Sequence, residues 1–166
     1  DGKGHQYHEG KEGTNKSLSQ AELVHYKYSD KYMALTSDAT QAYALVDKDI
    51  SKVIRTVIFI KPDIVIIIDK IGKKSNKSSV QVNYQIFNPD KMGKYKLENE
   101  NASFKILRPN AEVAVTAFSS SPLTITSDKL DIPEEIGVFP FVQISSAENL
   151  EHEIISCCCI NKVNSA

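Results

Sequence analysis

Tryptophan is absent from this chain of 166 residues, which has only three cysteines, four histidines and seven glycines. The cysteines are consecutive, at positions 157–159, so in a strand they would point to alternate faces. This arrangement argues against a disulfide framework, and we interpret the thiols as small buried hydrophobes. No apolar run approaches the roughly 20 residues of a membrane-spanning helix. The net charge of −1 gives no overall field for nucleic acid or an anionic membrane, so neither is expected as a partner.

A helical pattern is also missing, apart from a single turn predicted at 147–150. From about residue 20 onward, roughly eleven short segments alternate apolar and polar side chains between Asn, Pro and Ser breakers. Val80, Val82, Tyr84 and Ile86, for example, share one face of a strand. Strands at this spacing predict an all-β fold, an antiparallel two-sheet β-sandwich over residues 18–160 with less than about 10% helix. We expect one domain over residues 1–166.

Two apolar runs, residues 53–60 and 64–68, are joined by the turn Lys61-Pro62-Asp63. Each run is apolar at odd and even positions alike, so both faces of the pleat require cover. We therefore expect this pair at the centre of a sheet. One face fills the space between the sheets, and the other is covered by a loop, by a domain absent from the chain or by a second copy. The chain is thus interpreted as a fragment of a larger protein that alone dimerises or exposes an apolar patch.

The first twenty residues hold the strongest candidates for chemistry. His5 and His8 flank Tyr7 in a turn-rich segment, where they could meet a substrate or a metal. Two histidines are fewer ligands than zinc requires, so we predict no metal site and no cofactor in this chain. The glycines nearby lack the pattern of a phosphate-binding loop. His5, Tyr7 and His8 are therefore predicted only as substrate-binding residues.

The other polar residues favour structural roles. His25 and His152 are predicted to be surface imidazoles. The turn containing Asp47 and Asp49 lacks the further oxygen ligands of a calcium loop and is interpreted as solvated. The lysine- and serine-rich stretch 70–77 is interpreted as a long hairpin loop that keeps the chain soluble. No nucleophile and base can be paired, so the residues alone predict no catalytic group.

Three segments, taken in order, carry a resemblance to a known family. The chain begins with DGKG at 1–4 and continues with DATQAY at 38–43. The hairpin then reads RTVIFIKPD at 55–63 and IVIIID at 64–69. This order and spacing resemble the C-terminal β-sheet domain of the heparinase II/III family of polysaccharide lyases. The resemblance extends over about the first half of the chain and is architectural beyond it, and the stretch GHQYH at 4–8 is more similar to heparinase II than to heparinase III.

The resemblance implies a two-part, periplasmic or secreted enzyme, in which an N-terminal α/α toroid precedes a C-terminal β-sandwich. Such enzymes cleave acidic polysaccharides that contain uronic acid, of the heparin and heparan sulfate type, by β-elimination. A base removes the C5 proton, an acid protonates the leaving O4, and neighbouring groups stabilise the enolate. In the family these groups, and the ligands of a structural zinc where one occurs, lie in the toroid or before the DGKG turn. We therefore expect this chain, without the toroid and the first sandwich strands, to be inactive alone.

Two other functions stay open. A free-standing glycan-binding sandwich would stack sugars on Tyr7, Tyr26, Tyr28 or Tyr32, and a purely structural sandwich would pack against a partner. An upstream reading frame that encodes an α-helical toroid would favour the lyase. Affinity of this chain alone for heparin or alginate would favour the binding module, and neither result would favour the structural domain.

Overall fold

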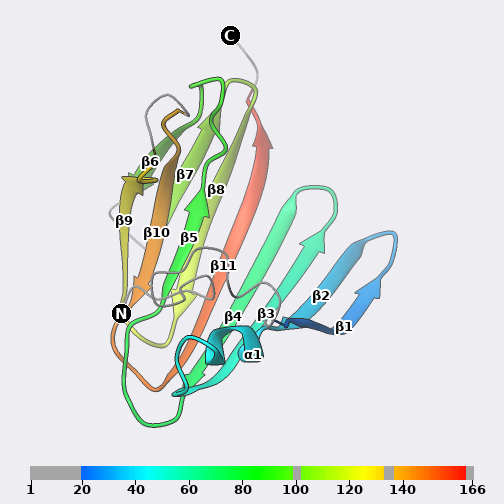
Figure 1. Ribbon diagram of the computed structural model, residues 1–166. Coiled ribbons are helices and arrows are strands. Elements are labelled where there is room, and N and C mark those ends of the chain that lie inside the picture. Colours follow the sequence, from blue (N-terminus) through cyan, green and yellow to red (C-terminus); the bar gives the residue numbers. More distant parts are fainter. Residues whose placement is uncertain (1–19, 99–101, 133–136, 164–166) are drawn as a thin grey trace.

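Two antiparallel sheets account for most of residues 20–98, 102–132 and 137–163, the part that the computed structural model describes (Figure 1). The large sheet has eight strands, in the spatial order β1 (Glu22–Tyr28), β2 (Tyr32–Asp38), β3 (Ile50–Ile60), β4 (Ile64–Lys73), β11 (Glu151–Lys162), β8 (Ala111–Ser119), β7 (Ser103–Arg108) and β6 (Lys94–Glu98). The small sheet has three, in the order β5 (Gln81–Gln85), β10 (Pro140–Ser146) and β9 (Leu123–Lys129). The predicted all-β, antiparallel two-sheet sandwich is confirmed.

One helix interrupts the strands, and it is not where a helical turn was expected. α1 (Thr40–Ala44) follows β2 and packs against β3. Residues 147–150 form a bend instead, in which Asn149 makes an isolated bridge to Ser78. Asp38 precedes the N-cap residue Ala39, and its Oδ1 accepts a hydrogen bond from the Thr40 amide at 2.8 Å, which fixes the turn into α1.

The buried core lies between the small sheet and only half of the large one. Val142 and Ile144 of β10 are fully buried against Phe104, Val115 and Ile154 of the large sheet. These residues occupy alternate positions in their strands, as the period-2 pattern predicts. No residue of β1, β2 or β3 belongs to this core. In Figure 1 the strands β1 to β3 extend to the right, beyond the small sheet.

Strand register identifies the two faces of the large sheet. Cys158 of β11 lies in the core and pairs with Val65 of β4, which pairs with Phe59 of β3. Because paired residues share a face, Phe59 points to the side of the small sheet, here called the inner face. The neighbouring residues Ile58 and Ile60 point to the opposite, outer face.

The apolar hairpin lies where its composition predicts. β3 and β4 are the third and fourth of eight strands, and they pair from Ile50 to Lys73 around the turn at 61–63. Their outward side chains continue across β11 and β8. This outer patch consists of Ile58, Ile60, Ile64, Ile66, Ile68, Ile155, Cys157, Cys159 and Phe118. Phe118 is 55% exposed and most of the others are half-buried, so the outer patch is apolar surface that no other described strand covers.

Candidate functional site

The residues predicted to bind substrate fall into different parts of the chain. His5, Tyr7 and His8 lie outside the described residues, so their role stays a prediction. Tyr26 and Tyr28 lie on the inner face of β1, since they pair with Leu35 and Met33 of β2. Tyr32 pairs with Ile60 and therefore points to the outer face. Tyr26 and Tyr28 can act together on one surface, and Tyr32 cannot join them.

The inner-face side chains of β1 to β3 form a surface that we call the open face. It consists of Leu23, Tyr26, Tyr28, Met33, Leu35, Arg55, Val57 and Phe59. The rings of Tyr26 and Tyr28 are 67% and 76% exposed, which is unusual for large side chains on the inner side of a sandwich. The open face is thus an apolar and aromatic surface, with the guanidinium of Arg55 as its one cation among the described residues.

Arg55 marks the border between the open face and the buried core. Its Nε donates to Asp69 Oδ1 at 2.6 Å and its Nη2 to Asp69 Oδ2 at 2.9 Å, a bidentate ion pair across β3 and β4. The Asp69 side chain is 7% exposed, whereas that of Arg55 is 50% exposed. The hydrogen bonds to Asp69 raise the pKa of Arg55 further. The pair therefore holds a guanidinium in a fixed orientation at the edge of the open face.

Two unsatisfied hydroxyl groups lie behind this ion pair. The Tyr84 Oη and the Ser156 Oγ are buried and have no hydrogen-bond partner among the described residues. Burial raises the pKa of Tyr84, and the nearby Ser156 hydroxyl offsets part of this rise. Such groups are normally satisfied by an ordered water molecule. The border of the core is therefore polar, next to the charged pair.

Two of the three segments that carry the family resemblance, DATQAY and the hairpin, meet at this border. Thr40 Oγ1 accepts a hydrogen bond from the Val53 amide at 2.9 Å, and the Ala39 amide donates to the Val53 carbonyl at 2.9 Å. Tyr43 of α1 lies close enough to Arg55 to contribute to its raised pKa. The DATQAY segment at 38–43 and the two charged ends of the hairpin thus fix one corner of the sheet.

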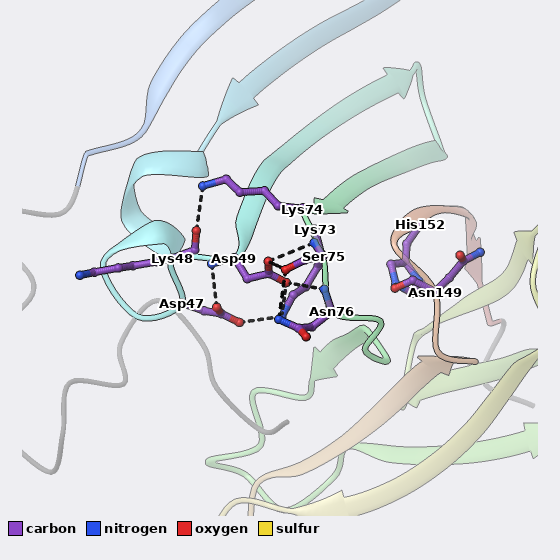
Figure 2. A network of polar contacts seen from close by, with 9 residues as sticks. All are labelled: Asp47, Lys48, Asp49, Lys73, Lys74, Ser75, Asn76, Asn149 and His152. Carbon is purple, nitrogen blue, oxygen red and sulfur yellow. Dashed lines mark hydrogen bonds and ion pairs between the residues drawn. The ribbon is translucent and has the colours of Figure 1, made fainter.

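A second polar network corrects two predictions (Figure 2). Lys73 is buried, and its ammonium binds Asp47 Oδ2 at 2.7 Å and lies 3.6 Å from Asp49 Oδ2. Asp49 also accepts hydrogen bonds from the hydroxyl of Ser75 and the amide of Asn76, at 2.6 and 2.9 Å. These bonds lower the pKa of Asp49 to about 2. The turn is therefore not simply solvated.

The stretch 70–77 is likewise no hairpin loop. β4 continues to Lys73, and the chain then crosses from the large sheet to β5 in the small one. The carboxylates of Asp47 and Asp49 bind Lys73 at the start of this crossing. Lys73 is therefore a structural residue and not a free surface cation.

His152 was predicted at the surface and is instead 4% exposed. Its Nδ1 lies 2.9 Å from Ser146 Oγ and its Nε2 lies 3.1 Å from the Asn149 carbonyl (Figure 2 shows His152 beside Asn149). A carbonyl can only accept, so Nε2 donates and Nδ1 accepts the Ser146 hydroxyl proton. The prediction failed because His152 stands between two exposed glutamates, which mask the inward position that it occupies in β11. His25, by contrast, is exposed as expected.

Other places in the described residues offer no stronger site. A shallow groove of about 450 Å³ lies beside β6 and β7, and its one arginine, Arg108, is bound to Asp90. In the described part of the chain, no three His, Cys, Asp or Glu side chains are placed to hold a metal ion. No helix there has the length and apolar character that crossing a membrane requires. The open face and its Arg55 border suit binding of a ligand; neither supplies a nucleophile with a base.

Comparison with known proteins gives a match in structure but not in sequence. No family model and no curated protein sequence matches the chain. The fold is similar to that of heparan sulfate lyase HepC from Pedobacter heparinus, with a TM-score of 0.70 and 10% identity over 89% of this chain and 22% of that one. A heparinase III gene product matches with a TM-score of 0.69 and 14% identity over 86% of this chain and 22% of that one. The YeaD protein from Salmonella typhimurium matches with a TM-score of 0.60 and 11% identity, over 86% and 65% of the two chains.

The similarity to the matched lyases covers only one part of each of those proteins. This chain spans about a fifth of their length, so its fold is that of one β-sandwich domain within a larger lyase. At these identities the likeness concerns the fold alone.

Proposed function

We propose that this chain is the C-terminal β-sandwich portion of a polysaccharide lyase that cleaves uronic-acid-containing polysaccharide by β-elimination. The observation that carries the proposal is the fold match over 89% of this chain to 22% of a heparan sulfate lyase. The order of the DGKG, DATQAY and hairpin segments supports it independently of the fold. The chain contributes no catalytic residue in this proposal, and it is inactive alone.

The remainder of the enzyme is an α/α toroid that supplies the acid and the base. Two apolar surfaces are available for it, the open face and the outer patch, and the outer patch could equally join two copies in a homodimer.

A structural zinc, in a parent that carries one, would be bound by residues outside this chain. We place the enzyme in the periplasm or outside the cell, where an acidic polysaccharide is met. The closer relation to heparinase II rests on residues 4–8, since the matched lyases are of the heparinase III type.

The experiment compares this chain with the product of the gene extended upstream. Each is incubated with heparin, heparan sulfate and alginate, and ultraviolet absorbance follows the unsaturated uronate that β-elimination creates. We expect product from the extended protein and none from residues 1–166. Product that grows in proportion to the added chain would contradict the proposal, as would an upstream frame with no helical toroid.

In the extended enzyme, His5→Ala and His8→Ala test the predicted cleft. We expect either change to lower turnover far more than it lowers the melting temperature, because a loop histidine that contacts substrate adds little to folding. Tyr7→Phe keeps the ring and removes the hydroxyl, so it separates stacking from hydrogen bonding. Unchanged kinetics in the histidine variants would remove both residues from the site.

A glycan-binding module is the second candidate, and the exposure of Tyr26 and Tyr28 favours it. Aromatic rings give a large rigid contact surface at low conformational cost. If this chain alone binds heparin or alginate, the double change Tyr26→Ala and Tyr28→Ala should weaken binding by about 30-fold or more, taking roughly 1 kcal/mol or more for each ring by analogy with nucleobases stacked on aromatic side chains. Tyr32→Ala, on the outer face, is the matched control and should bind as the parent chain does.

A further inference from the structure

The three consecutive cysteines are divided between the two faces of the large sheet. Cys158 is buried in the core, whereas Cys157 and Cys159 both point outward and are half-buried. All three thiols are free. The outward pair therefore presents two thiols on one face, two residues apart on a central strand.

The two outward thiols are close neighbours. Their β4 partners, Ile66 and Ile64, lie on the outer face, so the strand register places both thiols on that face, two residues apart. Burial raises the pKa of Cys158 to about 11, but its thiol belongs to the opposite face. Cys157 and Cys159 thus form a dithiol from which Cys158 is excluded.

A disulfide is a poor use of this geometry. Two steps along a strand separate the Cα atoms by roughly 6.6–6.8 Å. Disulfides favour about 5.5–6 Å and seldom exceed about 6.8 Å. A single ion between the sulfurs relaxes this constraint, because two bonds in line, each about as long as a Zn–S bond of about 2.3 Å, span about 4.6 Å.

The neighbouring strands leave the sulfurs accessible. On β8 the partners of Cys157 and Cys159 are Thr116 and Ala114, whose side chains are short. On β4 the partners are Ile66 and Ile64, which supply an apolar wall. Neither set includes a carboxylate or an imidazole that could complete a four-ligand zinc site.

We propose that Cys157 and Cys159 form a two-coordinate site for a soft, thiophilic ion, with Cu(I) as the natural occupant. Thiolates are the ligands that Cu(I) prefers, and it is satisfied by two of them in a linear arrangement. Binding converts two thiols and one Cu(I) into one bis-thiolate complex of charge −1 and releases two protons. No oxidant is required. The site uses neither the open face nor any residue of a missing domain. Both cysteines belong to the outer patch, however, so a toroid or a second copy that covers this patch would exclude the ion.

The test uses residues 1–166 under anaerobic conditions, with Cu(I) supplied against the colorimetric chelator bicinchoninate. We expect one Cu(I) per chain. Cys157→Ser and Cys159→Ser should each weaken binding by about 10²–10⁴-fold, because the second bond is no longer intramolecular. Cys158→Ala is the matched control on the other face of the same strand, and it should bind Cu(I) as the parent chain does.

Iodoacetamide labelling of the folded chain gives a second readout that needs no substitution. Mass spectrometry should find Cys157 and Cys159 modified and Cys158 spared, and one equivalent of Cu(I) should protect the first two. Circular dichroism confirms that each variant folds. Equal loss of binding in Cys158→Ala, binding that survives in both serine variants, or labelling unaffected by Cu(I) would overturn the proposal.

Discussion

Removing the Arg55 guanidinium leaves a carboxylate buried without its counter-ion. Arg55→Met keeps an unbranched apolar stem, but Asp69, whose side chain is 7% exposed, loses both of its charged hydrogen bonds. Breaking a buried ion pair from one side costs about 3–5 kcal/mol. Since Arg55 is half exposed, we expect the lower end, about 3 kcal/mol. For a domain of this size that lowers the melting temperature by roughly 6–12 °C.

The reverse changes give smaller effects and complete a double-mutant cycle. Asp69→Asn leaves an arginine that can turn toward solvent, so we expect a loss of about 1–2 kcal/mol. The pair Arg55→Met with Asp69→Leu removes both charges and should be within about 1 kcal/mol of the parent chain. Urea unfolding followed by far-ultraviolet circular dichroism measures each free energy of unfolding, with an unchanged slope as the sign that the unfolded state is the same.

An exposed ion pair next to Asp69 in the sequence serves as the control. Lys70 and Glu153 form an ion pair of 2.8 Å between the same sheet's β4 and β11, but on the outer face and with both side chains about half exposed. Lys70→Met should cost less than about 1 kcal/mol. Two results would contradict this reasoning. One is that Arg55→Met lowers the free energy of unfolding no more than Lys70→Met does. The other is that Arg55→Met with Asp69→Leu loses the sum of the two single losses. Either result would mean that the burial of Asp69 does not set the contribution of the ion pair to stability.

Three further substitutions test the other polar networks. His152→Ala should cost about 2–4 kcal/mol in urea unfolding, because it leaves a cavity and removes the acceptor of the Ser146 hydroxyl; a loss below about 1 kcal/mol would mean that His152 is not held as described. Lys73→Met should cost about 2–3 kcal/mol by the same assay, since Asp47 and Asp49 then repel each other, and an unchanged or higher stability would contradict the ion pair. Asp49→Asn should lower the melting temperature above about pH 4, and the difference from the parent chain should fade as the pH drops through about 2, because a depressed carboxyl pKa stabilises only while the group is ionised. A difference that stays constant from pH 7 to 2 would place the role of Asp49 in its shape alone.

The fold could be predicted because its signals are local. Period-2 alternation identified the strands, and the two-sided hydrophobicity of 53–60 and 64–68 placed β3 and β4 at the centre of a sheet. The ion pair could also have been predicted from the sequence. Arg55 and Asp69 lie seven residues on either side of Pro62, so a symmetric hairpin pairs them. Local pattern and local geometry give the same result there.

The features that could not be predicted depend on contacts between segments that are far apart in the sequence. The burial of His152 and Lys73 comes from segments that approach them only in the folded chain, and their exposed or charged neighbours point the other way. The open face could not be predicted, because the sequence pattern around a tyrosine that points to the inner face is the same as that around one that points to the outer face. Tyr28 and Tyr32 could be assigned to opposite faces only from the strand register.

The order of strands in the large sheet has a consequence for how the chain folds. β11, the last of the described strands, lies between β4 and β8 and pairs with both along most of its length. Until residues 151–162 are available, β4 and β8 each have an unpaired edge, and the edge of β4 is a run of isoleucines. An exposed apolar edge of this kind readily pairs with another chain. During synthesis the two halves of the sheet can form separately, but they join only when β11 has left the ribosome, so truncation before residue 151 should yield aggregation rather than a smaller domain.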